Sequence, residues 1–312
     1  MTGANLSNTD ARFANFTSSL MKNAKLVGIK ANNASFKLAR MSGADCRNGH
    51  FMFSNFDRAN IWLVNMTGAW INYANFTEAI INQTNLTKTK QRFVDFTRAK
   101  ITRVKFNGAE LISVKFKLAQ LKYANLNDAA ILQDIDFRRL SYWEGPGLYN
   151  RDLRAFKFRG THAWPYTKNC NLDSIDARET TGILSTASRF NKANFSDSKF
   201  SFNTTGGSFI QANFNNVRFD FGTIKMAMFD YTKMTNMEIV QVEFNGGSFK
   251  HVDFTGTKIH TDRTTFINGT NLKYARIPGK YKSYFESQDV KGLDKVTWLY
   301  EKGKEKKRRR KH

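Results

Sequence analysis

Large apolar residues recur at every fifth position from Leu6 to Ile131, and a second series of small residues stands two positions before each of them. The large series has one polar member, Gln91, and the small series, from Ala4 to Ala129, consists mainly of alanine. Five residues would turn a helix by about 500°, and a strand alternates with a period of two, so neither explains the pattern. The pattern predicts a coil with four five-residue sides, whose large side chains point to the axis and whose neighbours complete the core.

The pattern stops after 131 and resumes at Phe190, with a one-residue slip near 204–207. The intervening segment contains Pro146 and Pro165 and aromatic residues without the five-residue spacing, which is typical of chain outside a strand ladder. We therefore predict a first repeat run over 4–131, a non-repeat excursion over 132–187, a second run over 188–277, a cap over 278–303 and a basic tail over 304–312. The two runs correspond to about six and about four coils of twenty residues.

The two ends of the predicted coil differ. Leu293, Val296 and Tyr300 have helical spacing, and Gly303 can end that helix, so a short C-terminal helix is expected to cover the last coil. Nothing comparable precedes Ala4. We expect a partner or a second copy to dock on the open end of the first coil, on the residues Leu6, Phe16 and Met21.

Coils of twenty residues also fix which side chains lie above one another. The register predicts that Lys90 lies against Glu110 and Asp95 against Lys115. It predicts in the same way that Phe76, Phe96 and Phe116 form one stacked column in the core.

Four segments carry a recognisable motif: Ala-Asn-Phe-Thr at 14–17 and 74–77, Ala-Asn-Leu-Ser at 4–7 and Ala-Asn-Leu-Asn at 124–127. These segments resemble the repeat of the pentapeptide-repeat proteins, and the resemblance covers most of 4–131 and 188–277. It implies an all-β fold, a right-handed quadrilateral parallel β-helix. Some members of that family are DNA mimics that bind type II topoisomerases, but mimicry needs an acidic surface. The formal net charge of +23 disfavours that activity here.

Few features of the sequence indicate catalysis. The histidines are scattered, no metal-ligand spacing or phosphate-binding loop is present, and no cofactor is expected. The most distinctive polar group outside the repeats is Arg151, Asp152, Arg154 and His162, with Trp164 beside them. Loop packing with solvated charges explains this group, and a catalytic pocket in the 132–187 excursion stays as the alternative.

The cysteines and the N-terminal residues bear on the compartment. Cys46 falls on the large series, and Cys170 would take a small position if Leu172 is a large one. Both positions are typical of buried free thiols in a reducing environment. Residues 1–20 are polar and already inside the repeat, and no apolar run is long enough to span a membrane, so neither a signal peptide nor a transmembrane segment is expected. We expect an intracellular reducing compartment or a virion.

The positive charge points to polyanionic partners. Basic residues crowd into 88–122 and into the run from Lys306 to Lys311, and such clusters favour nucleic-acid phosphate or acidic proteins. With four sides per coil the first cluster spreads around the coil, which suits enclosure in an assembly. No recognition helix or stacking platform is visible, so contact without sequence specificity is expected. The predicted binding residues are Arg98, Lys100, Arg103, Lys105, Lys304, Lys306, Lys307, Arg308, Arg309, Arg310 and Lys311.

These observations favour a non-catalytic scaffold, a structural subunit of a large nucleic-acid-containing assembly such as a virion or a ribonucleoprotein. Its partners would be protein subunits and nucleic-acid phosphate, with an end-to-end contact at the N-terminal coil. Two alternatives remain: a free adaptor that binds acidic proteins, and an enzyme that uses the 132–187 excursion.

Overall fold

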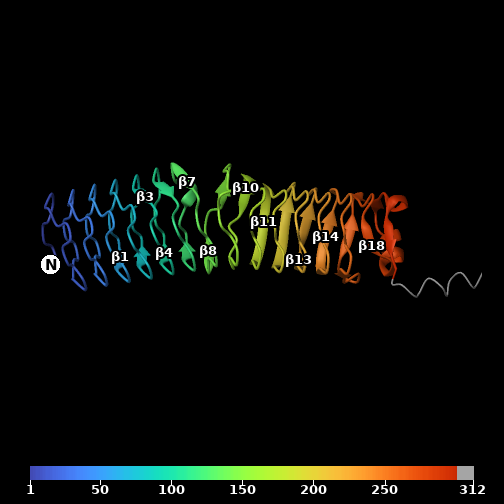
Figure 1. The fold of residues 1–312 in the computed structure, drawn as a ribbon, viewed down its shortest axis with the longest axis horizontal. Helices are drawn as coiled ribbons and strands as arrows, with labels where there is room; N and C mark the ends of the chain where they lie inside the picture. Colours follow the sequence, from blue (N-terminus) through green and yellow to red (C-terminus); the bar gives the residue numbers. More distant parts are fainter. Residues whose placement is uncertain (301–312) are drawn as a thin grey trace, which may run out of the picture. The chain divides into compact units, whose positions relative to one another are not determined.

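The computed structural model describes residues 1–300, apart from the side chain of Ser185. The chain divides into two compact units: unit 1 is Met1–Tyr149 with Ala155–Pro165, and unit 2 is Asn150–Arg154 with the chain from Tyr166 onward. Each unit is a parallel β-solenoid, in which every side of a coil pairs with the same side of the next coil (Figure 1). The predicted fold class is therefore confirmed. The division into these two units falls at other residues than the predicted boundaries of the repeat runs.

Unit 1 repeats every twenty residues over most of its length. One ladder of parallel bridges runs from Asn15 through Asn75 and Asp95 to Lys115. Both predicted pairs lie in register, but only Asp95 and Lys115 form an ion pair, at 3.6 Å, whereas Lys90 and Glu110 pair through the backbone. The strands of unit 1 are β1 (Asn60–Trp62), β2 (Ile80–Asn82), β3 (Lys90–Arg92), β4 (Lys100–Thr102), β5 (Glu110–Ile112), β6 (Gln120–Lys122), β7 (Ile131–Gln133), β8 (Tyr142–Glu144) and β9 (Leu148–Tyr149). All of these strands except β9 form two sheets, in the orders β1-β2-β4-β6-β8 and β3-β5-β7.

The sides of a coil join at tight turns that contain a residue with positive φ. In the first turn the Ala4 N–H donates to the Met1 carbonyl at 3.1 Å, and Gly3 has a φ of 67°. Glycine and asparagine adopt this left-handed conformation at little cost, which explains their frequency at the corners. Bulky residues also stand at some corners, for example Phe93 with a φ of 56°.

The core of unit 1 is the predicted column of rings. Phe76 stacks on Phe96 with ring centroids 5.1 Å apart, and Phe96 stacks on Phe116 at 5.3 Å. The members of the small series, mostly alanine with some valine, are buried beside them, where the wall of the coil leaves room for a small side chain. Each buried ring contributes about 1.5–3 kcal/mol to the stability of its coil.

The fifth-residue rule fails at Ile131, which is partly exposed, while Leu132 is buried in its place. The cause is a short 3₁₀ turn, η1 (Leu126–Asp128), at which the Asn125 side chain accepts a hydrogen bond from the Asn127 N–H. The coil gains one residue there, and Leu111 pairs with Leu132.

The predicted excursion over 132–187 is also wrong, because most of this segment continues the coils within its own unit. In unit 1, Lys115 pairs with Asp136 and Asp136 with Lys157, and Phe137 stacks on Phe116 at 5.7 Å. In unit 2, Asp152 pairs with Asn171. The coils here are no longer twenty residues long, which hides them from a fixed period while their backbone hydrogen bonds persist.

Unit 2 has longer strands than unit 1. They are β10 (Thr167–Asn171), β11 (Thr181–Arg189), β12 (Lys199–Thr205), β13 (Arg218–Lys225), β14 (Glu238–Asn245), β15 (Lys258–Ile259), β16 (Thr265–Ile267), β17 (Thr270–Asn271), β18 (Arg276–Pro278), β19 (Val290–Lys291) and β20 (Thr297–Leu299). The strands β10 to β15 are neighbours in chain order within one sheet. The predicted slip is present as a register shift between Phe200 and Thr204, where β12 pairs with β13.

The C-terminal cap differs from the prediction. The α-helix, α1, is Lys282–Glu286, it follows the 3₁₀ turn η2 (Gly279–Tyr281), and its Phe285 packs on Phe266 with ring centroids 4.9 Å apart. The predicted helix over 293–303 is wrong: η3 (Leu293–Lys295) is a 3₁₀ turn and β20 then pairs with β18. A further strand therefore covers the last coil, and the predicted stop at Gly303 lies outside the described residues.

Gln91, the one polar member of the large series, provides a test of the core. Its amide N–H donates to the Thr89 hydroxyl at 2.7 Å, but its carbonyl oxygen is buried without a hydrogen-bond partner among the described residues. Replacing Gln91 with leucine should raise the free energy of unfolding by about 1–3 kcal/mol, since the orphaned oxygen disappears and the new side chain matches its neighbour Leu111. Urea unfolding measures the change, and a destabilised variant would show that Gln91 has a structural role.

Candidate functional site

The predicted basic residues of unit 1 lie around two successive sides of one coil. Arg98 and Arg103 stand at corners with φ values of 59° and 51°, Lys100 begins β4, and Lys105 lies on the next side, bridged to Asn85 and Asn125. Arg98 is 3.6 Å from Glu78, and the Arg103 guanidinium lies 6.0 Å from the centre of the Tyr123 ring. The structure therefore wraps these cations around the coil and does not gather them on one flat surface.

Most cations of 88–122 have no carboxylate to neutralise them. Arg98, Lys115 and Lys122 form ion pairs with acidic side chains. Within the described part of the chain, no ion pair involves the remaining seven basic residues of this segment, which are Lys88, Lys90, Arg92, Lys100, Arg103, Lys105 and Lys117. Bridge ladders place these cations on different sides of the coil, as the sequence predicted.

Many acidic residues are occupied locally, through a motif that the sequence reading missed. In each Asp-x-Arg segment the aspartate accepts hydrogen bonds from the backbone N–H and the guanidinium of the arginine two residues later; the pairs are Asp10–Arg12, Asp45–Arg47, Asp136–Arg138, Asp152–Arg154 and Asp176–Arg178. The side-chain hydrogen bonds from Arg12 lower the pKa of Asp10 to about 2. Burial alone would raise the pKa of Asp136, but the bonds from Arg138 hold it below its ordinary value. The recurring spacing of two residues between an aspartate and an arginine could have revealed these pairs in the sequence.

The residues predicted at the open N-terminal end are only partly open. Leu6 and Phe16 are half-buried, and Phe16 stacks on Phe36 at 5.0 Å. Met21 is fully buried, so its prediction as a docking residue is wrong. Met1 stands one twenty-residue turn before it, which explains the burial. The predicted tail residues Lys304, Lys306, Lys307, Arg308, Arg309, Arg310 and Lys311 lie outside the described residues.

Three members of the polar group that was the alternative candidate for catalysis, Asp152, Arg154 and Trp164, make structural contacts. The carboxylate of Asp152 is held by Arg154 at 2.6 Å in unit 2, while Trp164, in unit 1, is buried and stacks on Phe158 at 4.5 Å. Burial raises the pKa of the Cys46 and Cys170 thiols, which opposes formation of a thiolate. Over the residues that the structure describes, no group of three or more His, Cys, Asp or Glu side chains is placed to hold a metal ion.

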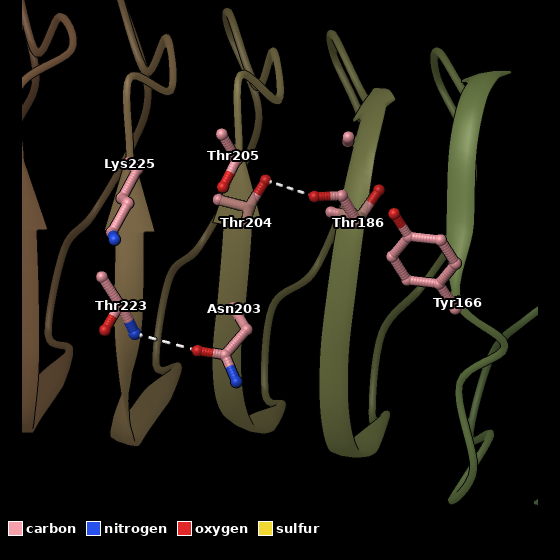
Figure 2. A pocket seen from close by; sticks show the side chains of 8 residues that line it. Tyr166, Thr186, Asn203, Thr204, Thr205, Thr223 and Lys225 are labelled. Carbon is pink, nitrogen blue, oxygen red and sulfur yellow. Dashed lines mark hydrogen bonds between the residues drawn. The ribbon is translucent and has the colours of Figure 1, made fainter.

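Unit 2 carries a shallow polar hollow of about 280 Å³ over strands β11 to β13 (Figure 2). Its walls include Tyr166, Thr186, Asn203, Thr204 and Lys225. The Thr204 hydroxyl donates to the Thr186 carbonyl at 2.6 Å, and the Asn203 side chain accepts from the N–H of Thr223 at 3.0 Å. These two contacts lie within the wall of the hollow and engage the Thr204 hydroxyl and the Asn203 carbonyl oxygen.

Two columns of exposed rings on unit 1 escaped the sequence reading, which found no stacking platform. Phe53 stacks on Tyr73 at 4.7 Å and Tyr73 on Phe93 at 5.0 Å, all at one corner. On the side that leads to this corner, His50 stacks on Trp70 at 5.0 Å. The members of each column are twenty residues apart. Writing the sequence in rows of twenty residues would therefore have placed them above one another and revealed both columns.

Comparison with known proteins identifies the repeat. A family model described as pentapeptide repeats matches residues 1–37 and 95–130, in 8 copies. No sequence among the curated proteins matches the chain. Within the described residues, no helix has the length and apolar character needed to cross a membrane.

Several solved structures are similar to the chain. HetL, a pentapeptide repeat protein involved in heterocyst differentiation regulation in the cyanobacterium Nostoc, has 14% identity, with 82% of this chain and 90% of HetL covered and a TM-score of 0.35. A pentapeptide repeat protein from the Arabidopsis thaliana thylakoid lumen has 26% identity over 33% of this chain and 65% of its own, with a TM-score of 0.24. QnrB1, a plasmid-mediated fluoroquinolone resistance protein, has 14% identity over 82% of this chain and 92% of its own, with a TM-score of 0.18.

Proposed function

Because this chain is a pentapeptide-repeat protein, we propose that it is a non-catalytic scaffold whose cationic surface docks on the phosphates of nucleic acid or on acidic subunits of a large assembly. The observation that supports this proposal is the set of seven basic residues in 88–122 without ion pairs among the described residues. Exposed cations that no carboxylate neutralises can release counterions from a polyanion, and this release drives such binding.

The distribution of charge favours an enclosed position. Lys90, Lys100 and Lys105 lie on three different sides of their coils, so a partner that touches one side leaves the others free for further partners. A component of a virion or a ribonucleoprotein particle meets that condition, because its neighbours surround it. The two buried free thiols, Cys46 and Cys170, are consistent with a reducing compartment or a particle assembled there.

The proposal assigns no catalytic step and needs no cofactor. The aspartates of the Asp-x-Arg pairs are already held by arginine, and the two thiols are buried. The basic surface alone carries the function, and it contacts phosphate or carboxylate without reading base sequence.

The proposal is tested with a variant that removes four cations together, Lys100→Gln, Arg103→Gln, Lys105→Gln and Lys117→Gln. Binding of the full chain to a single-stranded oligothymidylate, to a mixed-sequence duplex and to polyglutamate is measured against salt concentration. The slope of log K against log salt should become shallower by about 2–3.5 for the nucleic acids, because each lost phosphate contact removes up to about 0.9 from the slope.

A matched control removes four cations that already have partners, namely Arg12→Gln, Lys37→Gln, Arg47→Gln and Arg58→Gln, which pair with Asp10, Asp57, Asp45 and Glu78. The control loses the same formal charge and should change the slope much less. If the two variants have equal slopes, net charge alone explains the loss of binding and the unpaired cations have no special role. If the slope of the first variant is unchanged from that of the wild type, the proposal is wrong. Deleting 304–312 in either background measures the share of the tail.

A further inference from the structure

Three successive coils of unit 1 present a compact surface of large side chains, which we call the aromatic–basic face. Its outward-pointing residues alternate with the buried Phe51, Ile71 and Gln91. They are His50, Met52, Phe53, Trp70, Asn72, Tyr73, Lys90, Arg92 and Phe93. The face therefore joins three rows of side chains, one row from each coil, on one side and its adjoining corner.

The rings on this face are exposed and mutually ordered. Phe53, Tyr73 and Phe93 are each about half exposed, and Trp70 is 38% exposed. Single exposed apolar side chains are ordinary on protein surfaces, but a contiguous patch of several rings marks an interaction surface. Stacking fixes the rings before a partner arrives, which lowers the entropy lost on binding.

Charge defines the partner that would complement the face. Lys90 and Arg92 occupy its third row, with the Lys90 ammonium 4.6 Å from the centre of the Trp70 ring, and none of its nine residues is acidic. Tryptophan, tyrosine and arginine are also the residues enriched at the energetic centres of protein interfaces. A negatively charged partner with large apolar side chains matches both properties.

The orientation of the rings separates protein from nucleic acid as the occupant. Within the corner column, Tyr73 lies between Phe53 and Phe93 with interplanar angles of 6° and 16°, so both faces of the Tyr73 ring are covered. Nucleic-acid bases bind by stacking on free ring faces, and centroid spacings of 4.7 and 5.0 Å leave no room to insert one. Tyr73 therefore exposes only its ring edge, and Phe53 and Phe93, at the two ends of the column, each have one ring face covered. Ring edges suit aliphatic and aromatic side chains.

We propose that the aromatic–basic face binds an acidic protein segment that carries large apolar side chains. The rings receive the apolar side chains, and Lys90 and Arg92 receive the carboxylates. This site shares Lys90 and Arg92 with the basic set described above, but it does not use Lys100, Arg103, Lys105 or Lys117, and it needs an apolar contribution.

The chain offers a substitution that removes rings without disturbing the backbone. Asn33 stands at the same corner two coils before Tyr73, with a φ of 59°, against 60° for Tyr73 and 56° for Phe93. Asparagine tolerates this left-handed conformation well, so Tyr73→Asn with Phe93→Asn should fold normally. The matched control is Phe13→Asn, which removes an exposed ring at the same corner but outside the face.

The experiment selects binders of the full wild-type chain from a displayed library of random short peptides. The enriched sequences should combine Asp or Glu with Phe, Trp, Leu or Ile. Fluorescence anisotropy then compares the affinity of the enriched peptides for the variants. Removing two interface rings should weaken binding at least about tenfold, while Phe13→Asn should leave it within about twofold.

Three results would overturn the proposal: enrichment without acidic and apolar residues together, no enrichment, or equal peptide affinity for the wild type and the double variant. A fourth would assign the face to nucleic acid, namely a tenfold loss of oligothymidylate binding in the double variant with peptide binding unchanged. The double variant keeps Lys100, Arg103 and Lys105, so an intact salt slope for oligothymidylate beside lost peptide binding shows that the two sites fail independently.

Discussion

Replacing Phe96 with alanine should lower the free energy of unfolding of unit 1 by about 3–5 kcal/mol. Phe96 is fully buried between Phe76 and Phe116, with centroid distances of 5.1 and 5.3 Å. The coil above and the coil below are held at the spacing of their backbone hydrogen bonds, so they cannot move inward to fill the space. The variant therefore loses the free energy of burying the ring, and the cavity left in its place adds its full cost.

Chemical denaturation with a probe of unit 1 measures this loss. The control is Phe93→Asn, only three residues away, because that ring is exposed at a corner and its replacement suits the local backbone. It should change the free energy of unfolding by about 1 kcal/mol or less. Similar losses for Phe96→Ala and Phe93→Asn would contradict the assignment of Phe96 to the core column.

Replacing Gly222 with alanine should destabilise unit 2 by about 2–5 kcal/mol. Gly222 has a φ of 145°, and a Cβ atom there would lie 1.9 Å from the carbonyl oxygen of Phe202. It stands beside the register shift between Phe200 and Thr204, where β12 has one residue fewer than β13. The two strands approach closely because no side chain separates them, so alanine must push their backbones apart.

Gly206 provides the control for this prediction. Its φ of 73° is also positive, but a Cβ atom there would meet nothing within 4 Å. Gly206→Ala should therefore cost only the conformational penalty, about 1–2 kcal/mol. Thermal unfolding of both variants separates the two contributions, and equal shifts in Tm would show that the contact with Phe202 is unimportant.

The core of unit 1 could be predicted because one spacing governs it. The burial of Phe76, Phe96 and Phe116 follows from the five-residue period. The backbone register of Lys90 with Glu110 and of Asp95 with Lys115 follows from four such steps. Each coil buries its large residues only against its neighbours, so the sequence has to repeat the same solution in every coil.

The predictions from the five-residue spacing fail where the coil changes length. At Ile131 a single extra residue, accommodated in the turn η1, moves the buried position to Leu132. Over 132–187 the coils lose the twenty-residue repeat altogether, yet Phe137 keeps its place in the column. A rule based on fixed spacing cannot follow such shifts, because the backbone pairing that carries the fold does not depend on side-chain spacing.

The candidate site was predictable in charge but not in detail. Lys100, Arg103 and Lys105 could be named from the sequence, whereas the pairing of Asp10 with Arg12 and the stacking of Phe53 on Tyr73 depend on which side chains share a turn or a corner. Both relations follow from spacings of two and twenty residues once the coil is known. The same repeat thus determines both the core, through the spacing of five residues, and these surface contacts, through the spacings of two and twenty residues.

The backbone pairing of unit 1 has an evolutionary consequence. The backbone of Asn55 bridges to Ser35 in the coil before it and to Asn75 in the coil after it, and the other isolated bridges of unit 1 likewise join neighbouring coils. Duplication or loss of a whole twenty-residue segment would join two equivalent interfaces and leave every other turn undisturbed. The length of such a chain can therefore drift by unequal recombination, and selection can extend its outer surface one turn at a time.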